Sequence, residues 1–268
     1  MRLILIAPYQ NPAVNWGSIL RELVDKMKKK GALEGVEVDI DEGYFIDSPS
    51  EKRDEEFLAN ISVGIINKVK EYSEMDKYDA IVLTGAIDPG FVGARVVSKI
   101  PISGALHSAV HVASLIGRRF SEIHTVPSSS LMIRRYAEIY GFSHKLASVR
   151  MCGHTSTEIY GLIDNYKDNK EERFKDPELK KIIDDITAQS IAAIEKDRSD
   201  SLILGCEPLQ LLADPVRQRL DEAGYNEIPI ICELPAGVEM ARVMVNMRLI
   251  QVPRAYPGAA LKAKPEYW

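Results

Sequence analysis

The sequence of 268 residues has few cysteines and no long apolar segment. Its three cysteines, at positions 152, 206 and 232, are too few and odd in number for a disulfide framework, and they favour a reducing cytoplasm. No apolar run reaches the roughly 18 residues that would predict a membrane-spanning helix. The apolar start of the chain ends at Pro8 and is too short for a signal peptide, so we expect it to form a core strand.

The sequence also lacks an excess of positive charge. Its net charge is −5 and its pI is about 5.7, which gives no electrostatic basis for binding nucleic acid or an anionic membrane. Apolar residues make up 46% of the chain and charged residues 27%, as in an ordinary globular protein with a substantial core. We therefore expect a small molecule as the binding partner, with no nucleic acid and no membrane.

One pattern occurs twice along the chain. Residues 79–85 read DAIVLTG and residues 200–206 read DSLILGC, 121 positions later. In each copy an acidic residue precedes a short apolar run, and small residues follow where the chain must turn. Gly85 and Cys206 hold equivalent positions, so the two halves carry one potential nucleophile between them.

Apolar runs of strand type alternate with amphipathic helical stretches in both halves. This alternation predicts an α/β fold of two pseudo-symmetric, doubly wound lobes with parallel sheets, flavodoxin-like in type. We expect residues 1–105 and 225–268 to form lobe one and residues 106–224 to form lobe two. Ligands of such folds bind beyond the carboxyl ends of the strands, which places the active site between the lobes. The tail from Pro253 to Trp268 is expected to pack as an arm on this or another subunit.

Several segments together resemble the aspartate/glutamate/hydantoin racemase superfamily, and the hydantoin racemase branch in particular. They are residues 10–12 (QNP), 88–90 (DPG), 100–104 (IPISG), 116–120 (IGRRF) and 204–206 (LGC). In that family two cysteines face each other across the substrate α-carbon, and no cofactor or metal takes part. The resemblance implies a homo-oligomer. Gly85 stands where the first cysteine is expected, as in the arylmalonate decarboxylases of the same superfamily.

Cys206 is the main catalytic candidate. It follows a strand in a Gly-Cys turn near a helix start, where backbone N–H groups stabilise a thiolate. Gly205 and Glu207 flank it, and Glu207 could orient a substrate amine or raise the pKa of the thiol. Gly85 would leave room for a larger substituent or a water molecule.

Other polar residues follow the strands of the expected cleft. Thr84 could donate a hydrogen bond to a substrate carboxylate. Asn11 and the cluster Ser128, Ser129 and Ser130 are candidate ligand contacts, although asparagine is common in turns and serine is common at helix starts. His107 could supply the second acid/base that Gly85 lacks. His107 and His111 have the i, i+4 spacing of half a metal site, but no third ligand is evident, so we expect no metal. The resemblance implies that no other cofactor is needed.

These features predict a cofactor-independent enzyme, a racemase or other isomerase, that moves protons at the α-carbon of a small carboxylate or cyclic ureide. The absent first cysteine keeps alternatives open within the same superfamily: a one-thiol decarboxylase, an isomerase, or a hydrolase with Cys206 as nucleophile. A protein that binds a small molecule without catalysis is the alternative from a different class.

Overall fold

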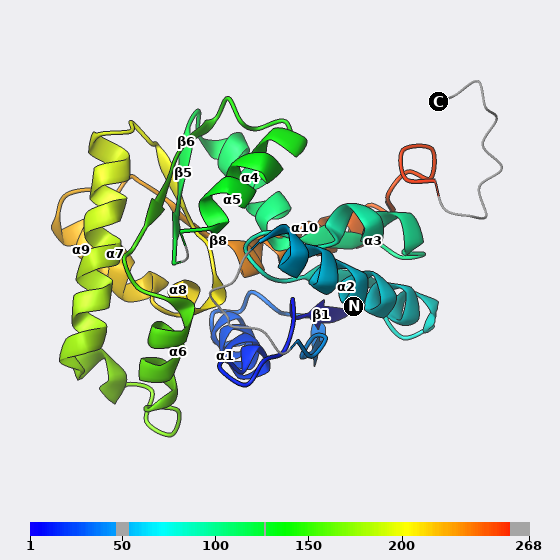
Figure 1. Ribbon diagram of the computed structural model, residues 1–268, viewed down its shortest axis with the longest axis horizontal. Coiled ribbons are helices and arrows are strands. Elements are labelled where there is room, and N and C mark those ends of the chain that lie inside the picture. Colours follow the sequence, from blue (N-terminus) through cyan, green and yellow to red (C-terminus); the bar gives the residue numbers. More distant parts are fainter. Residues whose placement is uncertain (47–53, 126, 258–268) are drawn as a thin grey trace.

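The computed structural model describes residues 1–46, 54–125 and 127–257. Two parallel sheets of four strands each form its framework. Figure 1 shows one half on the right, the other on the left, and helices α4 and α10 between them. The two lobes that the repeat predicts are therefore present, with the expected parallel pairing throughout.

The first sheet has the order β2-β1-β3-β4. Its elements follow in the chain as β1 (Arg2–Ile6), α1 (Trp16–Lys29), β2 (Glu37–Asp41), α2 (Glu55–Glu74), β3 (Ala80–Leu83), α3 (Phe91–Val97) and β4 (Ile102–Gly104). The central strands β1 and β3 are almost wholly buried, as the continuous apolar runs predict.

The second sheet repeats this order as β6-β5-β7-β8. Its elements are α4 (Ala105–Ile116), β5 (Phe120–His124), α5 (Ser129–Ile139), β6 (Leu146–Met151), α6 (Ser156–Asp164), the 3-10 helix η1 (Glu172–Lys175), α7 (Pro177–Glu195), β7 (Ser201–Leu204), α8 (Glu207–Leu211), α9 (Ala213–Glu222), β8 (Ile230–Cys232) and α10 (Glu233–Asn246).

The two halves exchange helices. Helix α4 leaves the first sheet and packs against β7 and β8, whereas α10 leaves the second sheet and packs against β3 and β4. The two helices also pack against each other. Strand β8 pairs with β7, so residues 230–232 belong to the second sheet, although the sequence-based division placed 225–268 in lobe one. The chain crosses to the first lobe only after this strand.

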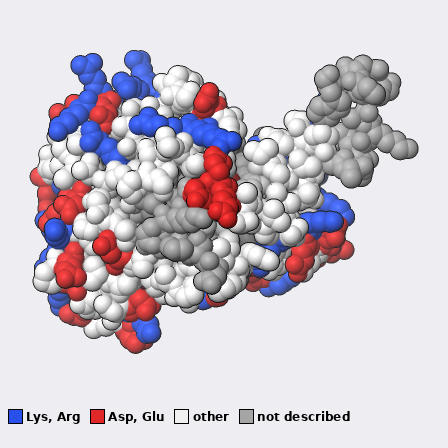
Figure 2. Space-filling model, in the orientation of Figure 1, with Lys and Arg blue, Asp and Glu red and all other residues white. Residues whose placement is uncertain are grey.

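Both sheets direct the carboxyl ends of their strands towards the junction between the halves. Side chains from the end of each central strand therefore meet there. No helix among the described residues is long and apolar enough to span a membrane. On the face in Figure 2, acidic side chains lie among the basic ones, and neither sign covers the face continuously. Of the tail, residues 258–268 lie outside the described residues.

Candidate active site

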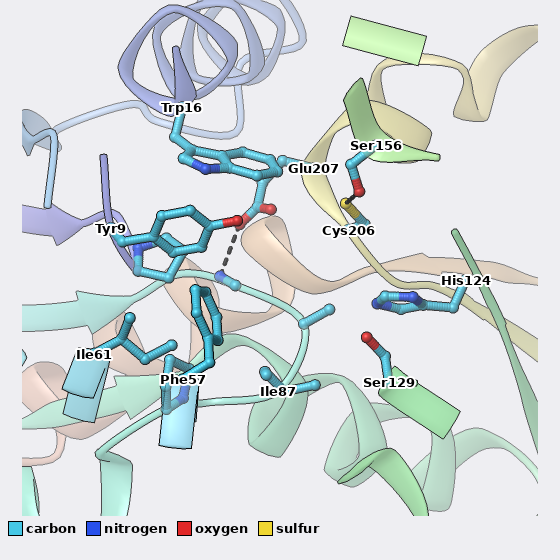
Figure 3. Close-up of a pocket in the computed structure, with 14 residues that line it drawn as sticks. Tyr9, Trp16, Phe57, Ile61, Ile87, His124, Ser129, Ser156, Cys206 and Glu207 are labelled. Atoms are coloured by element: carbon cyan, nitrogen blue, oxygen red, sulfur yellow. Dashed lines mark hydrogen bonds between the residues drawn. The ribbon is translucent and has the colours of Figure 1, made fainter. Parts of the chain in front are cut away.

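A small pocket of about 30 Å³, partly open to solvent, lies between the two halves (Figure 3). The loops after β1, β3, β5 and β7 all contribute to its lining, as the predicted cleft requires. Its lining residues are Pro8, Tyr9, Trp16, Phe57, Ile61, Gly85, Ala86, Ile87, Pro89, His124, Ser129, Ser156, Cys206 and Glu207.

Cys206 occupies a sharp turn between a strand and a helix. It lies between β7 and α8, and its φ of +76° is unusual for any residue other than glycine. Such a conformation costs roughly 1–3 kcal/mol and is found most often at functional sites. The same strand–turn–helix geometry presents the nucleophile in other enzyme folds. The turn brings the side chain of Cys206 to the pocket wall.

The thiol of Cys206 has a hydroxyl neighbour. Ser156 Oγ lies 3.2 Å from Cys206 Sγ, and Thr125 Oγ1 lies 2.8 Å from Ser156 Oγ. Ser156 is the first residue of α6, which Thr155 and Glu158 begin with reciprocal capping hydrogen bonds. A hydroxyl that donates to sulfur favours the thiolate over the thiol. Helix α6 thus holds a group that can activate Cys206.

Gly85 and Glu207 form a contact across the junction. Gly85 has a φ of +101°, and a Cβ at this position would lie 3.1 Å from Pro8 Cβ. Its N–H donates a hydrogen bond of 2.7 Å to Oε1 of Glu207, a buried residue of α8 (Figure 3). A carboxylate from the second half therefore occupies the space beside Gly85.

The first half supplies an aromatic wall. Tyr9 packs edge-on against Trp16 and Phe57, with ring centroids 5.9 and 5.2 Å apart. Two polar atoms of pocket-lining residues are buried without a hydrogen-bond partner among the described residues: Trp16 Nε1 and Ser129 Oγ. Because buried polar groups in proteins are almost always hydrogen-bonded, both atoms are available to a ligand.

Buried carboxyl groups lie behind the thiol. Glu233, at the start of α10, accepts a 3.4 Å hydrogen bond from the backbone N–H of Cys206. A Cβ on Gly205 would come within 2.4 Å of Glu122 Oε1, so only glycine permits this close approach. Burial raises the pKa of Glu233, and the charges of Glu122 and Glu207 raise it further. Burial also raises the pKa of Glu122.

The structure does not bring His107 into this pocket. Its ring packs against Phe91, His111 and Tyr140, and its Nε2 lies 3.1 Å from Arg95 Nη2. Burial, followed by the charges of Arg95 and His111, lowers the pKa of His107 to about 3. The prediction that His107 serves as the second acid/base therefore loses its geometric basis, because the histidine lies in α4 away from the thiol.

Five other candidates border the site without lining the pocket. The side chain of Asn11 accepts hydrogen bonds from the N–H groups of Ala13 and Val14, so it stabilises its own turn. Thr84 is fully buried, and Ser128 is exposed at the N-cap of α5. The backbone N–H groups of Ser130 and Gly205 donate hydrogen bonds to the carbonyls of Pro127 and Ile123. The candidates that do line the pocket are Gly85, Ser129, Cys206 and Glu207.

Sequence reasoning missed Ser156, His124 and the aromatic residues. His124 is the last residue of β5, and the sequence offered the signal that it precedes the turn at Pro127. Tyr9 follows the first strand in the same way. Ser156 was harder to identify from the sequence, because the capping box in residues 155–158 was the one local sign of a helix there.

The chain is similar in sequence to proteins of known function. The family described as Asp/Glu/hydantoin racemase matches residues 18–241. The chain belongs to this family. A hydantoin racemase from Rhizobium meliloti is 31% identical over 183 residues, which cover 68% of this chain and 66% of the relative. One from Pseudomonas sp. (strain NS671) is 27% identical over 69% of this chain and 65% of the relative. The chain thus spans slightly less than two thirds of the length of these two racemases.

Solved structures share the whole racemase fold. The allantoin racemase of Pseudomonas fluorescens superimposes with a TM-score of 0.77 at 19% identity and covers 98% of this chain and 99% of its own. Unliganded arylmalonate decarboxylase gives 0.52 at 15% identity, with 99% and 96% coverage. At these identities the likeness concerns the fold, which is that of two parallel-sheet α/β lobes.

Proposed function

We propose that this member of the racemase family inverts the configuration at the α-carbon of a cyclic ureide of hydantoin type, with Cys206 as one of its acid/base groups. The observation that carries the proposal is the placement of Cys206. Its thiol lies at a pocket between two parallel sheets, on a strained turn and beside a hydroxyl. A proton donor or acceptor of this kind contributes typically 10²–10⁴-fold to a rate.

The unpartnered donors support an enolate-like intermediate. Removing the α-proton places negative charge on the neighbouring carbonyl oxygen of the substrate. Trp16 Nε1 and Ser129 Oγ are buried and without partners among the described residues, so they can donate hydrogen bonds to a ligand oxygen. Donors fixed in advance around such an oxyanion stabilise the transition state by several kcal/mol.

The charge of the lining favours a neutral substrate. None of the described residues that line the pocket is lysine or arginine, whereas Glu207 contributes a carboxylate. A substrate carboxylate would meet no opposite charge there, and the carboxylate of Glu207 would repel it. A hydantoin ring carries no carboxylate, and it offers the N–H and C=O groups that the polar side chains of the pocket can pair with.

The aromatic wall indicates the substituent on that ring. Tyr9, Phe57 and Ile61 form an apolar surface at one end of the pocket (Figure 3). Burying an apolar substituent there yields about 25 cal/mol per Å². We therefore expect hydantoins with benzyl or isobutyl substituents to be preferred over those with polar substituents such as a ureido group.

One-thiol decarboxylation is the second candidate. Cys206 is the only cysteine among the described residues that line the pocket, and Gly85 holds the equivalent position in the first half. A single thiol can protonate a planar carbanion from one face after carbon dioxide leaves. The lining weighs against this candidate, because an arylmalonate brings two carboxylates and the described lining residues include Glu207 but no lysine or arginine.

Proton exchange tests the proposal. The protein is incubated in deuterium oxide with single enantiomers of hydantoins and amino acids and with arylmalonates, and Cys206→Ser is run beside it. Racemisation of a hydantoin with deuterium entering the α-carbon, lost in the variant, is expected. Carbon dioxide release from an arylmalonate would instead show the decarboxylase. Absence of both activities with the whole panel would contradict the proposed function.

A further inference from the structure

We propose that Glu207 is the second catalytic acid/base, so that this enzyme pairs one thiol with one carboxylate where its two halves would suggest two thiols. The inference rests on the proposed racemisation, because only inversion requires proton transfer at both faces of the α-carbon. It assigns a proton-transfer role to a residue that the sequence suggested only as a binding group.

The position of the carboxylate supports this assignment. Cys206 and Glu207 are neighbours in the chain, but their side chains leave the strained turn in different directions. Figure 3 shows the sulfur of Cys206 beside Ser156, whereas the carboxylate of Glu207 lies away from the sulfur. This carboxylate accepts the hydrogen bond from Gly85 N–H. The hydrogen bond from Gly85 N–H fixes Oε1 at 2.7 Å, on the side of the pocket that belongs to the first half.

The conformation of Gly85 explains why the acid/base comes from elsewhere. With φ at +101° and Pro8 at 3.1 Å from the position of a Cβ, the backbone of residue 85 disfavours any side chain. A carboxylate that reaches across the junction brings a titratable group to the same place without that strain.

Four other titratable groups fit less well, those of His124, Cys152, Glu122 and Glu233. His124 lines the pocket, but its ring packs against the turn that carries Cys206, since its Cδ2 would lie 2.8 Å from a Cβ on Gly205. The carboxylate of Glu207 instead reaches Gly85 in the first half. Cys152, although buried, is not among the lining residues, and its Sγ is directed to the carbonyl of His154. Glu122 and Glu233 lie behind the Gly205–Cys206 turn rather than in the pocket.

The proton transfers balance in each direction. In one direction the Glu207 carboxylate removes the α-proton, the electron pair of the C–H bond passes into the enolate, and the Cys206 thiol protonates the opposite face. The enzyme is left with a carboxylic acid and a thiolate. That pair is the starting form for the opposite enantiomer, and proton exchange with water restores the first form.

Glu207→Gln is a matched test, because the amide oxygen can still accept the hydrogen bond from Gly85 N–H but the side chain cannot carry the proton. Each enantiomer of 5-benzylhydantoin is incubated separately with the variant in deuterium oxide. Inversion should fall at least about 100-fold. One enantiomer should still exchange its α-proton through Cys206 within about tenfold of the wild-type rate, with retention of configuration. Ser129→Ala is the control, since loss of an oxyanion donor should slow exchange from both enantiomers together.

Two results would overturn the assignment. Inversion by Glu207→Gln within a few-fold of wild type would show that another group serves the second face. Equal loss of exchange from both enantiomers, in a variant with wild-type circular dichroism, would show that Glu207 only binds or positions. Should the variant not fold, Glu207→Asp replaces it: slower inversion than same-face exchange is expected, and equal slowing would contradict the proposal. If the wild-type protein itself gives no exchange, the proposed function fails rather than the role of Glu207.

Discussion

The loops after β3 and β7 each contain a residue with positive φ, but these two residues differ in chemistry. Gly85 and Cys206, which the repeat places at equivalent positions, have φ values of +101° and +76°. Glycine adopts this conformation freely, whereas cysteine adopts it at a cost. Both turns therefore place a residue with positive φ at the pocket, and only the turn in the second half carries a thiol there.

The two halves also hold the N-termini of α4 and α10 differently. In the first half the carboxylate of Asp88 accepts hydrogen bonds from the N–H groups of Leu106 and His107 in α4 and from Tyr140 Oη. In the second half Gln210 Oε1 accepts a hydrogen bond from the N–H of Leu234 in α10. The titratable carboxyl group of Asp88 therefore caps the N-terminus of α4, and the neutral amide of Gln210 caps that of α10.

Removing the thiol should have the largest effect. We expect Cys206→Ser to lower kcat/KM for a hydantoin about 10²–10⁴-fold, because a serine hydroxyl is a far weaker acid than a thiol. Steady-state polarimetry measures the loss. The free energy of unfolding should change little, and activity within threefold of wild type would show that the two loops do not differ in function.

The two helix caps should differ in their dependence on pH. Burial raises the pKa of Asp88 from 3.8 to about 6 despite its three donors. A carboxyl group with a raised pKa contributes most stability below pH 3.8, and that contribution is lost as pH rises to about 6, by up to roughly 3 kcal/mol. The stability difference between wild type and Asp88→Asn should therefore shrink between pH 4 and pH 7.

Urea unfolding at several pH values measures this difference. Gln210→Ala is the control in the second half, and its effect of about 1 kcal/mol should not vary with pH. A difference for Asp88→Asn that stays constant or grows between pH 4 and pH 7 would contradict the assignment of a raised pKa.

A side chain at position 85 should be tolerated worse than one on an unstrained glycine. Gly85→Ala forces a Cβ towards Pro8 at positive φ, and we expect it to lower the free energy of unfolding by about 1–2 kcal/mol. Gly161→Ala in α6 meets no atom within 4 Å and should be neutral or stabilising by up to about 1 kcal/mol. Thermal unfolding of both variants separates the two positions, and equal behaviour would show that the bend at Gly85 is not strained.

The smallest effect is expected at the neighbour of the thiol. Ser156→Ala removes the hydroxyl 3.2 Å from Cys206 Sγ. Losing one hydrogen bond of about 1 kcal/mol should lower kcat/KM about fivefold and shift the thiol pKa upwards. The rate of thiol alkylation as a function of pH measures that shift, and an unchanged alkylation profile would show that Ser156 does not stabilise the thiolate.

The sequence by itself determined the fold class, the repeat and the position of the thiol. The limits of β3 (Ala80–Leu83), β6 (Leu146–Met151) and α7 (Pro177–Glu195) follow from their apolar patterns and from the turn and capping residues beside them. Alternating strands and helices leave few topologies, so the parallel sheets followed as well. Cys206 was identifiable because its loop is the counterpart of a loop at Gly85.

Only the tertiary structure decided which polar groups meet. The pairing of β8 with β7, the burial of His107 in α4 and the contact of Glu207 with Gly85 N–H each join segments far apart in the chain. Local sequence specifies helices and strands through propensity and periodicity, but it carries no information on how two sheets are placed across a junction. That placement depends on the packing of α4 against α10, and it determines which side chains share the pocket with Cys206.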